Sequence, residues 1–126
     1  FHLEDPIEYM HGLLDNFDIV GQNDFDRLCT GFYMVKSSDL TVDLFDTTEK
    51  LVLDGEQSDQ NYIHTKLQSD KYSSLKVHKL NEDSFPNGYR WYKWNKRLNP
   101  SIVHYNSVDS IEGKIDKMKQ FNHWLV

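Results

Sequence analysis

Residues 100–106 read Pro100-Ser101-Ile102-Val103-His104-Tyr105-Asn106 and predict the end of a buried strand. Ile102 and Val103 are β-branched and stand just after a proline, which is excluded from helix interiors. Side chains two residues apart in a strand share a face. We therefore expect His104 and Asn106 to point to the same side of the sheet.

A helix is expected directly after this strand. The run Asp109-Ser110-Ile111-Glu112 has the spacing of a capping box, in which an acid at the N-cap is followed by Glu three residues later. Lys114 falls on the first turns of that helix. An imidazole beside a helix N-terminus and a lysine suits a metal-bound diphosphate. The alternative is that His104 is a hydrogen-bonded core histidine and Lys114 a solvated surface charge.

Composition excludes some classes of protein. The chain has 126 residues, of which 38% are hydrophobic, enough for one domain with a core. Its net charge of −6 argues against general nucleic-acid binding, which needs a basic surface. The mean hydropathy of −0.69 and the lack of a long apolar run exclude a membrane span within the sequence. Cys29 is the single cysteine, so no internal disulfide is possible.

The first residues read as the tail of a strand that leads into a helix. Asp5 suits the N-cap and Pro6 the first helical position. A domain seldom begins in this way, so we expect residues 1–126 to be one domain that forms the C-terminal part of a longer one. A signal or membrane anchor, if there is one, would then lie outside this chain. No compartment is predicted, and both the cytoplasm and the Golgi or secretory lumen stay open.

Strands alternate with helices along the chain, which predicts an α/β fold. Residues 28–36 are nearly all apolar, as in a central strand covered on both faces, and Gly31 within it suggests close approach by a ligand or by backbone. The other expected elements are strands at 17–20 and 75–78, a loop at 21–27, a turn at 85–89, and helices at 5–14, 38–54, from 56 past 67, and 110–124. Helical spacing places Leu44 and Leu51 on the inner side of the second of these helices, Ile63 and Leu67 on that of the third, and Ile111, Ile115 and Met118 on that of the last.

An aromatic cluster stands among basic residues late in the chain. Trp91, Tyr92 and Trp94 alternate with Arg90 and Lys93. Such a cluster is typical of a nucleic-acid stacking platform, but the acidic net charge disfavours that interpretation. Core packing is the default, and an aromatic wall for a sugar ring is the functional alternative.

Six short motifs follow one another along the sequence: Asp5-Pro6, Phe17-Asp18-Ile19-Val20, Cys29-Thr30-Gly31-Phe32-Tyr33, Asp59-Gln60, Phe85-Pro86-Asn87-Gly88, and residues 102–106 with Lys114. In this order and with these spacings they resemble the nucleotide-diphospho-sugar transferase family. The resemblance implies a GT-A-like mixed sheet flanked by helices. It also implies metal-dependent transfer of a sugar from a nucleoside-diphosphate sugar to a carbohydrate or other hydroxyl acceptor.

The resemblance assigns the donor side of the site to the end of the chain. His104 matches a histidine that approaches Mn²⁺ or Mg²⁺, while the Asp-x-Asp motif that binds this ion in the family would stand before Phe1. Asn106 matches the polar residue after the histidine, and Lys114 matches a lysine that neutralises the diphosphate, assisted by the helix N-terminus at Ser110. Family members usually carry glycine near Ser110, whereas this chain has Gly113, which puts the phosphate contacts in doubt.

The resemblance assigns the sugar and acceptor side to two other motifs. Thr30 and Gly31 would line the bound sugar. Asp59 would orient a hydroxyl or offset positive charge that develops at the anomeric carbon, and Gln60 would hydrogen-bond the sugar. The alternatives are that Asp59 only caps the helix that it opens and that Gln60 is a solvated helix residue.

Two other functions stay open from the sequence. The chain is an inactive or partner-dependent fragment if the other half of the donor site is required, and apolar strand faces would then be exposed. It is a carbohydrate-binding module if Trp91, Tyr92 and Trp94 form a stacking surface.

Overall fold

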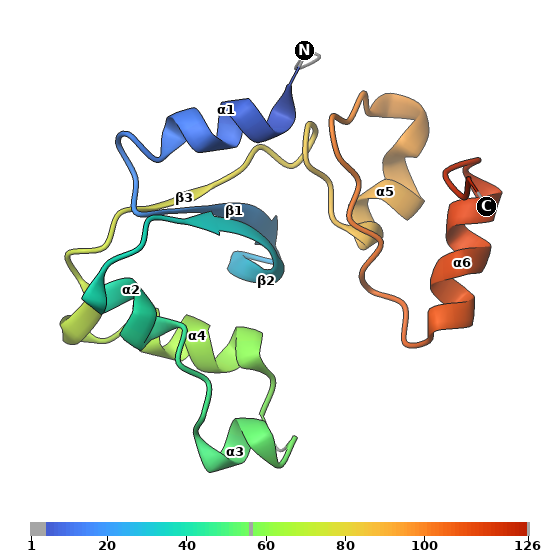
Figure 1. The fold of residues 1–126 in the computed structure, drawn as a ribbon. Coiled ribbons are helices and arrows are strands. Elements are labelled where there is room, and N and C mark those ends of the chain that lie inside the picture. The colour runs from blue at the N-terminus through green and yellow to red at the C-terminus, as the bar shows by residue number, and fades with distance from the viewer. Residues whose placement is uncertain (1–4, 56, 126) are drawn as a thin grey trace. The chain divides into compact units, whose positions relative to one another are not determined.

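The computed structural model describes residues 5–55 and 57–125. These residues form two compact units, which we describe separately. The first unit is Asp5–Leu80, and the second contains residues 81–125. The first unit holds a mixed sheet flanked by helices, as expected for an α/β protein (Figure 1).

The first helix begins where the sequence predicts. Helix α1 spans Pro6–Leu13, with Asp5 as its N-cap. The Asp5 carboxylate accepts hydrogen bonds from the backbone N–H groups of Ile7 and Glu8, over 2.9 and 3.0 Å. These bonds satisfy two of the donors that a helix leaves unpaired at its start, and Pro6 has no N–H to satisfy.

Three strands form the sheet within the described residues. They are β1 (Ile19–Asp24), β2 (Arg27–Val35) and β3 (Val77–Lys79), in the order β2-β1-β3. β1 is antiparallel to β2 and parallel to β3. A two-residue turn joins β1 to β2, and both of its residues, Phe25 and Asp26, have positive φ angles, 49° and 65°. This geometry matches the right-handed twist of a hairpin.

The central strand of this sheet is β1, so the prediction of residues 28–36 as the central strand is wrong. Ile19 and Val20 point to opposite faces of β1, and both are fully buried. Figure 1 shows α1 over one face of the sheet and the helices at Asp39–Leu44 (α2) and Asp59–Leu67 (α4) over the other. β2 is an edge strand in the described sheet, and Gly31 within it is exposed. β3 is the opposite edge of the described sheet; the strand expected at 75–78 is present, and it spans Val77–Lys79.

The loop predicted at 21–27 is confirmed only for Phe25 and Asp26, which form the turn between β1 and β2, and is wrong for the other residues. Gly21 to Asp24 continue β1, and the Gln22 side chain within this run is fully buried. A polar run in a sequence usually indicates a loop, but here the polar side chains lie in the most buried strand.

The remaining helices of the first unit cover one side of the sheet. They are α2 (Asp39–Leu44), α3 (Lys50–Leu53), α4 (Asp59–Leu67) and the short 3₁₀ helix η1 (Asp70–Tyr72). Leu44 and Ile63 join a core made with Ile19, Leu28 and Tyr72, and Leu67 packs against it.

The single helix predicted over 38–54 is broken into α2 and α3. The Asp46 side chain accepts hydrogen bonds from the backbone N–H and the hydroxyl of Thr48, over 3.0 and 2.7 Å. An aspartate that bonds the backbone two residues ahead forms a turn instead of continuing a helix. Leu51, expected on the inner stripe of that helix, lies outside the described side chains.

The second unit contains α5 (Gly88–Trp94), the 3₁₀ helix η2 (Asn95–Arg97) and α6 (Ile111–Gln120). Residues 102–106 form no strand in the part of the chain that the structure describes. They instead run beside 84–86, where the Ser84 carbonyl accepts from the N–H groups of Ser101 and Ile102. The predicted strand end is therefore wrong, because these residues bond a loop and no other strand. The turn predicted at 85–89 is instead the start of α5, with Asn87 as N-cap.

Helix α6 differs from its prediction at both ends. Its N-cap is Ser110, whose hydroxyl accepts from the Gly113 N–H over 3.0 Å, so the capping role predicted for Asp109 is wrong. Ile111 is 74% exposed and does not face inward. The helix ends at Gln120, before the expected Trp124.

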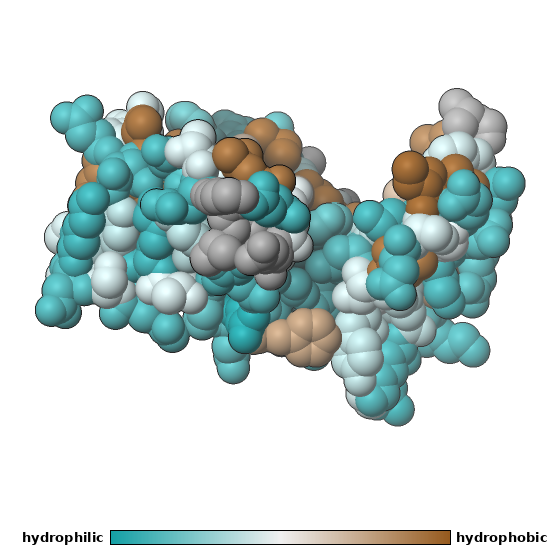
Figure 2. Space-filling view, turned by 90° about the horizontal axis from the view of Figure 1, so that it is seen from below, coloured by the Kyte–Doolittle hydropathy of each residue, from teal (hydrophilic) through white to brown (hydrophobic). Residues whose placement is uncertain are grey.

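The surface agrees with the low mean hydropathy. The face shown in Figure 2 is mostly hydrophilic, with small separate hydrophobic areas. Among the described residues, none of the helices has the length and apolar character that crossing a membrane requires.

Candidate functional site

Gln60 bonds another predicted site residue, Thr30, and a residue that was not predicted, Asp24. It is the second residue of α4, which Ser58 caps through a 3.2 Å bond from the Asn61 N–H. The Gln60 carboxamide donates to the Asp24 carboxylate over 3.0 Å and accepts from the Thr30 N–H over 3.4 Å. Gln60 is thus not a solvated helix residue. It ties the start of α4 to the end of β1 and to β2.

Asp59 lies beside this bridge. Its carboxylate accepts from the Gln60 N–H over 2.7 Å, while Ser58 provides the helix cap. The alternative that Asp59 only caps α4 is therefore wrong, because Ser58 is the N-cap. Together Asp24, Thr30, Asp59 and Gln60 form a polar cluster at the junction of the sheet and α4, which we call the Gln60 cluster.

Two carboxylates act on the same neighbour in this cluster. Burial raises the pKa of the Cys29 thiol, hydrogen bonds from the backbone of Gly31 and Phe32 partly oppose this, and the charges of Asp24 and Asp59 raise it further. The charges of both carboxylates therefore act on the Cys29 thiol. Two carboxylates near one another suit binding sugar hydroxyls and offsetting positive charge on a reacting sugar.

Asp24 is the site residue that the sequence reasoning missed. It was included in the expected loop at 21–27, although it is the last residue of β1 and precedes the turn of the hairpin. The turn pair Phe25-Asp26 gave little signal, because hairpin turns of this geometry usually contain glycine or asparagine. Gly31, the other predicted residue here, is exposed on β2, and its backbone bonds the Cys29 thiol.

Asn106 has a structural role in the second unit. Its side-chain oxygen accepts from the Gly88 N–H over 2.6 Å, and its carbonyl accepts from the Tyr92 hydroxyl over 2.9 Å. Burial, with a smaller effect from Tyr105, raises the pKa of Tyr92 to about 12, so this hydroxyl stays a donor at neutral pH. Asn106 thus fixes the first turn of α5.

Two motifs that are distant in the sequence, 85–88 and 102–106, pack against each other at Gly88. A Cβ at this position would lie 2.1 Å from the Asn106 carbonyl oxygen and 2.8 Å from the Tyr92 hydroxyl. Asn87 caps α5 by accepting from the Arg90 N–H over 2.9 Å. The His104 N–H bonds the Pro86 carbonyl over 3.3 Å. Residues 85–88 and 102–106 therefore form one packed structure.

The predicted phosphate residues lie at the start of α6. The Ser110 hydroxyl is engaged as the N-cap, and Lys114 is exposed on the same helix. A Cβ on Gly113 would lie 2.6 Å from Val108 and 3.0 Å from the Ser110 hydroxyl. The glycine that the sequence shows at 113 is thus required by packing around the cap.

The residues described do not make a metal site by themselves. His104 is half-buried, and nowhere in 5–55 or 57–125 do three or more His, Cys, Asp or Glu side chains gather as metal ligands. Among the described residues, His104 is the one side chain predicted to bind a divalent ion, and one ligand does not define a metal site.

The aromatic cluster is not one continuous surface. Trp91 is 8% exposed and packs between Phe121 and His123, with ring centroids at 5.3 and 5.6 Å. Trp94 is 37% exposed and lies under the charged groups of Lys93 and Arg97. Trp91 is therefore mainly a core residue, and Trp94 is a surface residue.

Comparison with known proteins gives one family and one curated relative. The family model described as nucleotide-diphospho-sugar transferase matches residues 3–119. The chain is similar to the UDP-galactose:fucoside alpha-3-galactosyltransferase of Dictyostelium discoideum. The two sequences are 24% identical over an alignment of 132 positions, which covers 89% of the chain. The chain spans only about a fifth of that relative, 20% of its length. No solved structure matches the chain.

Proposed function

Because the chain belongs to the nucleotide-diphospho-sugar transferase family, we propose that it serves the transfer of a sugar from a nucleoside-diphosphate sugar to a hydroxyl of a carbohydrate acceptor. The observation that best supports a role of these residues is the Gln60 bridge. It holds Asp24 and Thr30 together from two strands, and Asp59 is the residue before Gln60 on α4.

In the proposed reaction the bond between the anomeric carbon and the diphosphate oxygen breaks, and its electron pair leaves with the diphosphate. The acceptor oxygen forms the new bond and loses its proton. Positive charge develops on the sugar during this exchange. We assign Asp59 and Asp24 to offset that charge or to orient a hydroxyl, with Gln60 as the positioning residue whose side chain holds Asp24.

We further propose that the sheet corresponds to part of a GT-A-type fold and that His104 contributes one nitrogen ligand to Mn²⁺ or Mg²⁺. A borderline nitrogen ligand favours Mn²⁺ slightly, and the other ligands would be diphosphate oxygens and groups outside the described residues. Lys114, Asn106 and the α6 N-terminus at Ser110 are the residues proposed to face the diphosphate. Lys114 is exposed, as this role requires. The oxygens of Asn106 and Ser110 already have backbone partners, so their side chains act through helix placement.

A donor panel tests this proposal. The printed name of the Dictyostelium relative suggests UDP-galactose as the first donor and a fucoside as the first acceptor. The intact protein is incubated with UDP-galactose, UDP-glucose, UDP-xylose or GDP-mannose, with and without methyl fucoside and Mn²⁺, and the released nucleotide diphosphate is measured. Release that depends on the acceptor supports glycosyl transfer. Lack of release with all donors, with and without added partner proteins, contradicts it.

A further inference from the structure

The second unit carries a group of exposed aromatic and basic side chains on α5 and η2. Tyr89 and Trp94 are large hydrophobic residues, yet both are exposed. Lys93, Lys96 and Arg97 stand near them in the sequence and are also exposed. We call these five residues the Trp94 patch. Aromatic and arginine side chains are enriched at the surfaces where proteins bind one another.

Two basic groups of the patch are held against its rings. The Lys93 ammonium lies over the Trp94 indole, 5.1 Å from the ring centroid, and 5.7 Å from the centroid of the Tyr89 ring. The Arg97 guanidinium lies over the same indole, at 5.3 Å. A cation over an aromatic face is attracted by the electrons of the ring. The rings therefore hold two positive charges in place before a partner arrives, which lowers the entropic cost of binding.

The basic residues of the patch have no carboxylate partner within the part of the chain that the structure describes. Arg90, on the same helix, pairs with Asp83. By contrast, the salt bridges of residues 5–55 and 57–125 include none of the basic residues of the patch. Residues 81–126 contain seven Lys and Arg against five Asp and Glu, whereas the whole chain has a net charge of −6. The patch is thus a local positive surface on an acidic protein, and its complement is an anionic partner.

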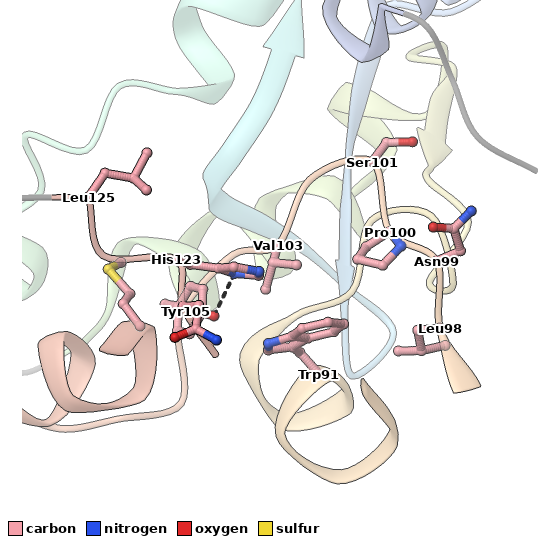
Figure 3. Close-up of a pocket in the computed structure, with 11 residues that line it drawn as sticks. Trp91, Leu98, Asn99, Pro100, Ser101, Val103, Tyr105, His123 and Leu125 are labelled. Atoms are coloured by element: carbon pink, nitrogen blue, oxygen red, sulfur yellow. Dashed lines mark hydrogen bonds between the residues drawn. The ribbon is translucent and has the colours of Figure 1, made fainter. Parts of the chain in front are cut away.

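The patch is separate from the cavity of the second unit. This cavity has a volume of about 720 Å³, and Figure 3 shows Trp91, Tyr105 and His123 around it. Of the described residues that line the cavity, none belongs to the Trp94 patch. The patch side chains are exposed, and a single ion pair at an exposed surface contributes little. A partner must therefore present several anionic groups together with apolar surface for the two rings.

A short acidic segment of a protein meets these requirements better than other polyanions. A membrane surface or a nucleic acid is extended, so it also meets the acidic residues that give the chain its net charge. A short segment lies on the patch alone, and screening at physiological salt limits the effect of more distant charges to about 8 Å. Carboxylates also form bidentate pairs with arginine.

We propose that the Trp94 patch docks an acidic segment of a partner protein. In this complex two or more carboxylates pair with Lys93, Lys96 and Arg97. An apolar side chain between these carboxylates packs on Tyr89 and Trp94. The proposal goes beyond the transfer reaction and does not depend on it, because docking is measured without a nucleotide sugar.

The test measures binding of a fluorescent pentapeptide, Asp-Glu-Phe-Glu-Asp, to the full chain by fluorescence anisotropy at about 50 mM salt. The double variant Lys93→Gln/Arg97→Gln should bind about tenfold more weakly, because it removes two charges beside the rings. Lys114→Gln/Lys119→Gln is the matched control, since it removes two exposed charges from α6 of the same unit and should change binding less than about twofold. Trp94→Ala keeps every charge and should weaken binding about tenfold.

The double variant decides the test if Trp94→Ala does not fold, because both of its substituted side chains are exposed. The proposal is overturned if the peptide does not bind at about 1 mM. It is also overturned if the two double variants lose binding equally, which would show that net charge alone is sensed, or if the peptide Lys-Arg-Phe-Arg-Lys binds as well. Vesicles of phosphatidylcholine with phosphatidylserine, and oligothymidine, are the comparison probes. Tighter binding of either one that is lost in Lys93→Gln/Arg97→Gln would overturn the acidic segment in favour of a membrane or a nucleic acid.

Discussion

The Gln60 carboxamide donates to the Asp24 carboxylate over 3.0 Å, although 36 positions separate the two residues in the sequence. The same carboxamide accepts from the Thr30 N–H, so one side chain connects α4 to two neighbouring strands. The Gln60 side chain therefore positions the Asp24 carboxylate, while the backbone N–H of Gln60 bonds the Asp59 carboxylate.

We expect Gln60→Ala to lower the turnover of the proposed transfer at least about tenfold, because a small displacement of a reacting group costs much rate. Losing one hydrogen bond to a carboxylate and one neutral hydrogen bond should lower the free energy of unfolding by about 2–4 kcal/mol. Gln68→Ala is the matched control, since Gln68 lies at the other end of α4. Steady-state kinetics and thermal denaturation measure both effects. Equal turnover in the two variants would show that Gln60 does not position the site.

We expect Gly88→Ala to destabilise the protein by about 2–3 kcal/mol, the cost of overpacking. The new methyl group would lie 2.1 Å from the Asn106 carbonyl oxygen. Gly12→Ala is the control, because a Cβ there has no atom within 4 Å, and it should stabilise α1 by about 0.5–1 kcal/mol. Denaturant unfolding compares the two variants. If both alanines had the same effect, the packing of 85–88 against 102–106 would be wrong.

Local signals account for what the sequence predicted well. The cap at Asp5 and the start of α2 at Ser38 depend on side chains that bond backbone two or three residues away, and both are confirmed. The inward positions of Leu44 and Ile63 follow from helical spacing and are also confirmed. These features need no knowledge of distant partners.

Long-range partners account for what the sequence could not give. The apolar run at 28–36 predicts a central strand. The central position depends on which strand pairs with β3, and β3 pairs with β1. Ile102 and Val103 favour a strand by type, yet their neighbours are the carbonyls of a loop. Asp24 became part of the candidate site through Gln60, a contact that no local pattern encodes.

The stability of the first unit should depend on Asp43 at low pH. A hydrogen bond from Lys71 and another from Tyr72 lower the pKa of the Asp43 carboxyl below its model-compound value of 3.8. A lowered pKa contributes stability that is present above the unfolded-state value and is lost as the pH falls through the folded-state value. Asp43→Asn should therefore lower the melting temperature at pH 7 but much less at pH 2.

Melting curves of wild type and Asp43→Asn between pH 2 and pH 7 measure this difference. Asp15→Asn, an exposed substitution after α1, is the control and should show little change at any pH. A difference between Asp43→Asn and wild type that stayed constant over the whole pH range would contradict the charge-based account.

His104→Ala should reduce turnover and weaken its dependence on Mn²⁺, with about a tenfold rise in the Mn²⁺ concentration for half-maximal activity. The far-UV circular dichroism should stay that of the wild type. His64→Ala is the control, because His64 is also half-buried but lies on α4. An unchanged Mn²⁺ response in His104→Ala would remove this residue from the proposed metal site.

The most direct test of the proposed function follows the sugar itself. UDP-galactose labelled with ¹³C at the anomeric carbon is incubated with the intact protein and methyl fucoside, and mass spectrometry detects the labelled disaccharide. Asp24→Asn and Asp59→Asn should each lower its formation by about a hundredfold, because each removes a charge proposed to stabilise the transition state. Asp26→Asn, in the hairpin turn where asparagine tolerates a positive φ, should leave it unchanged. Glycosyl transfer predicts the labelled disaccharide, with this donor or with another from the panel. Labelled free sugar alone, or equal product from all three variants, would contradict the account.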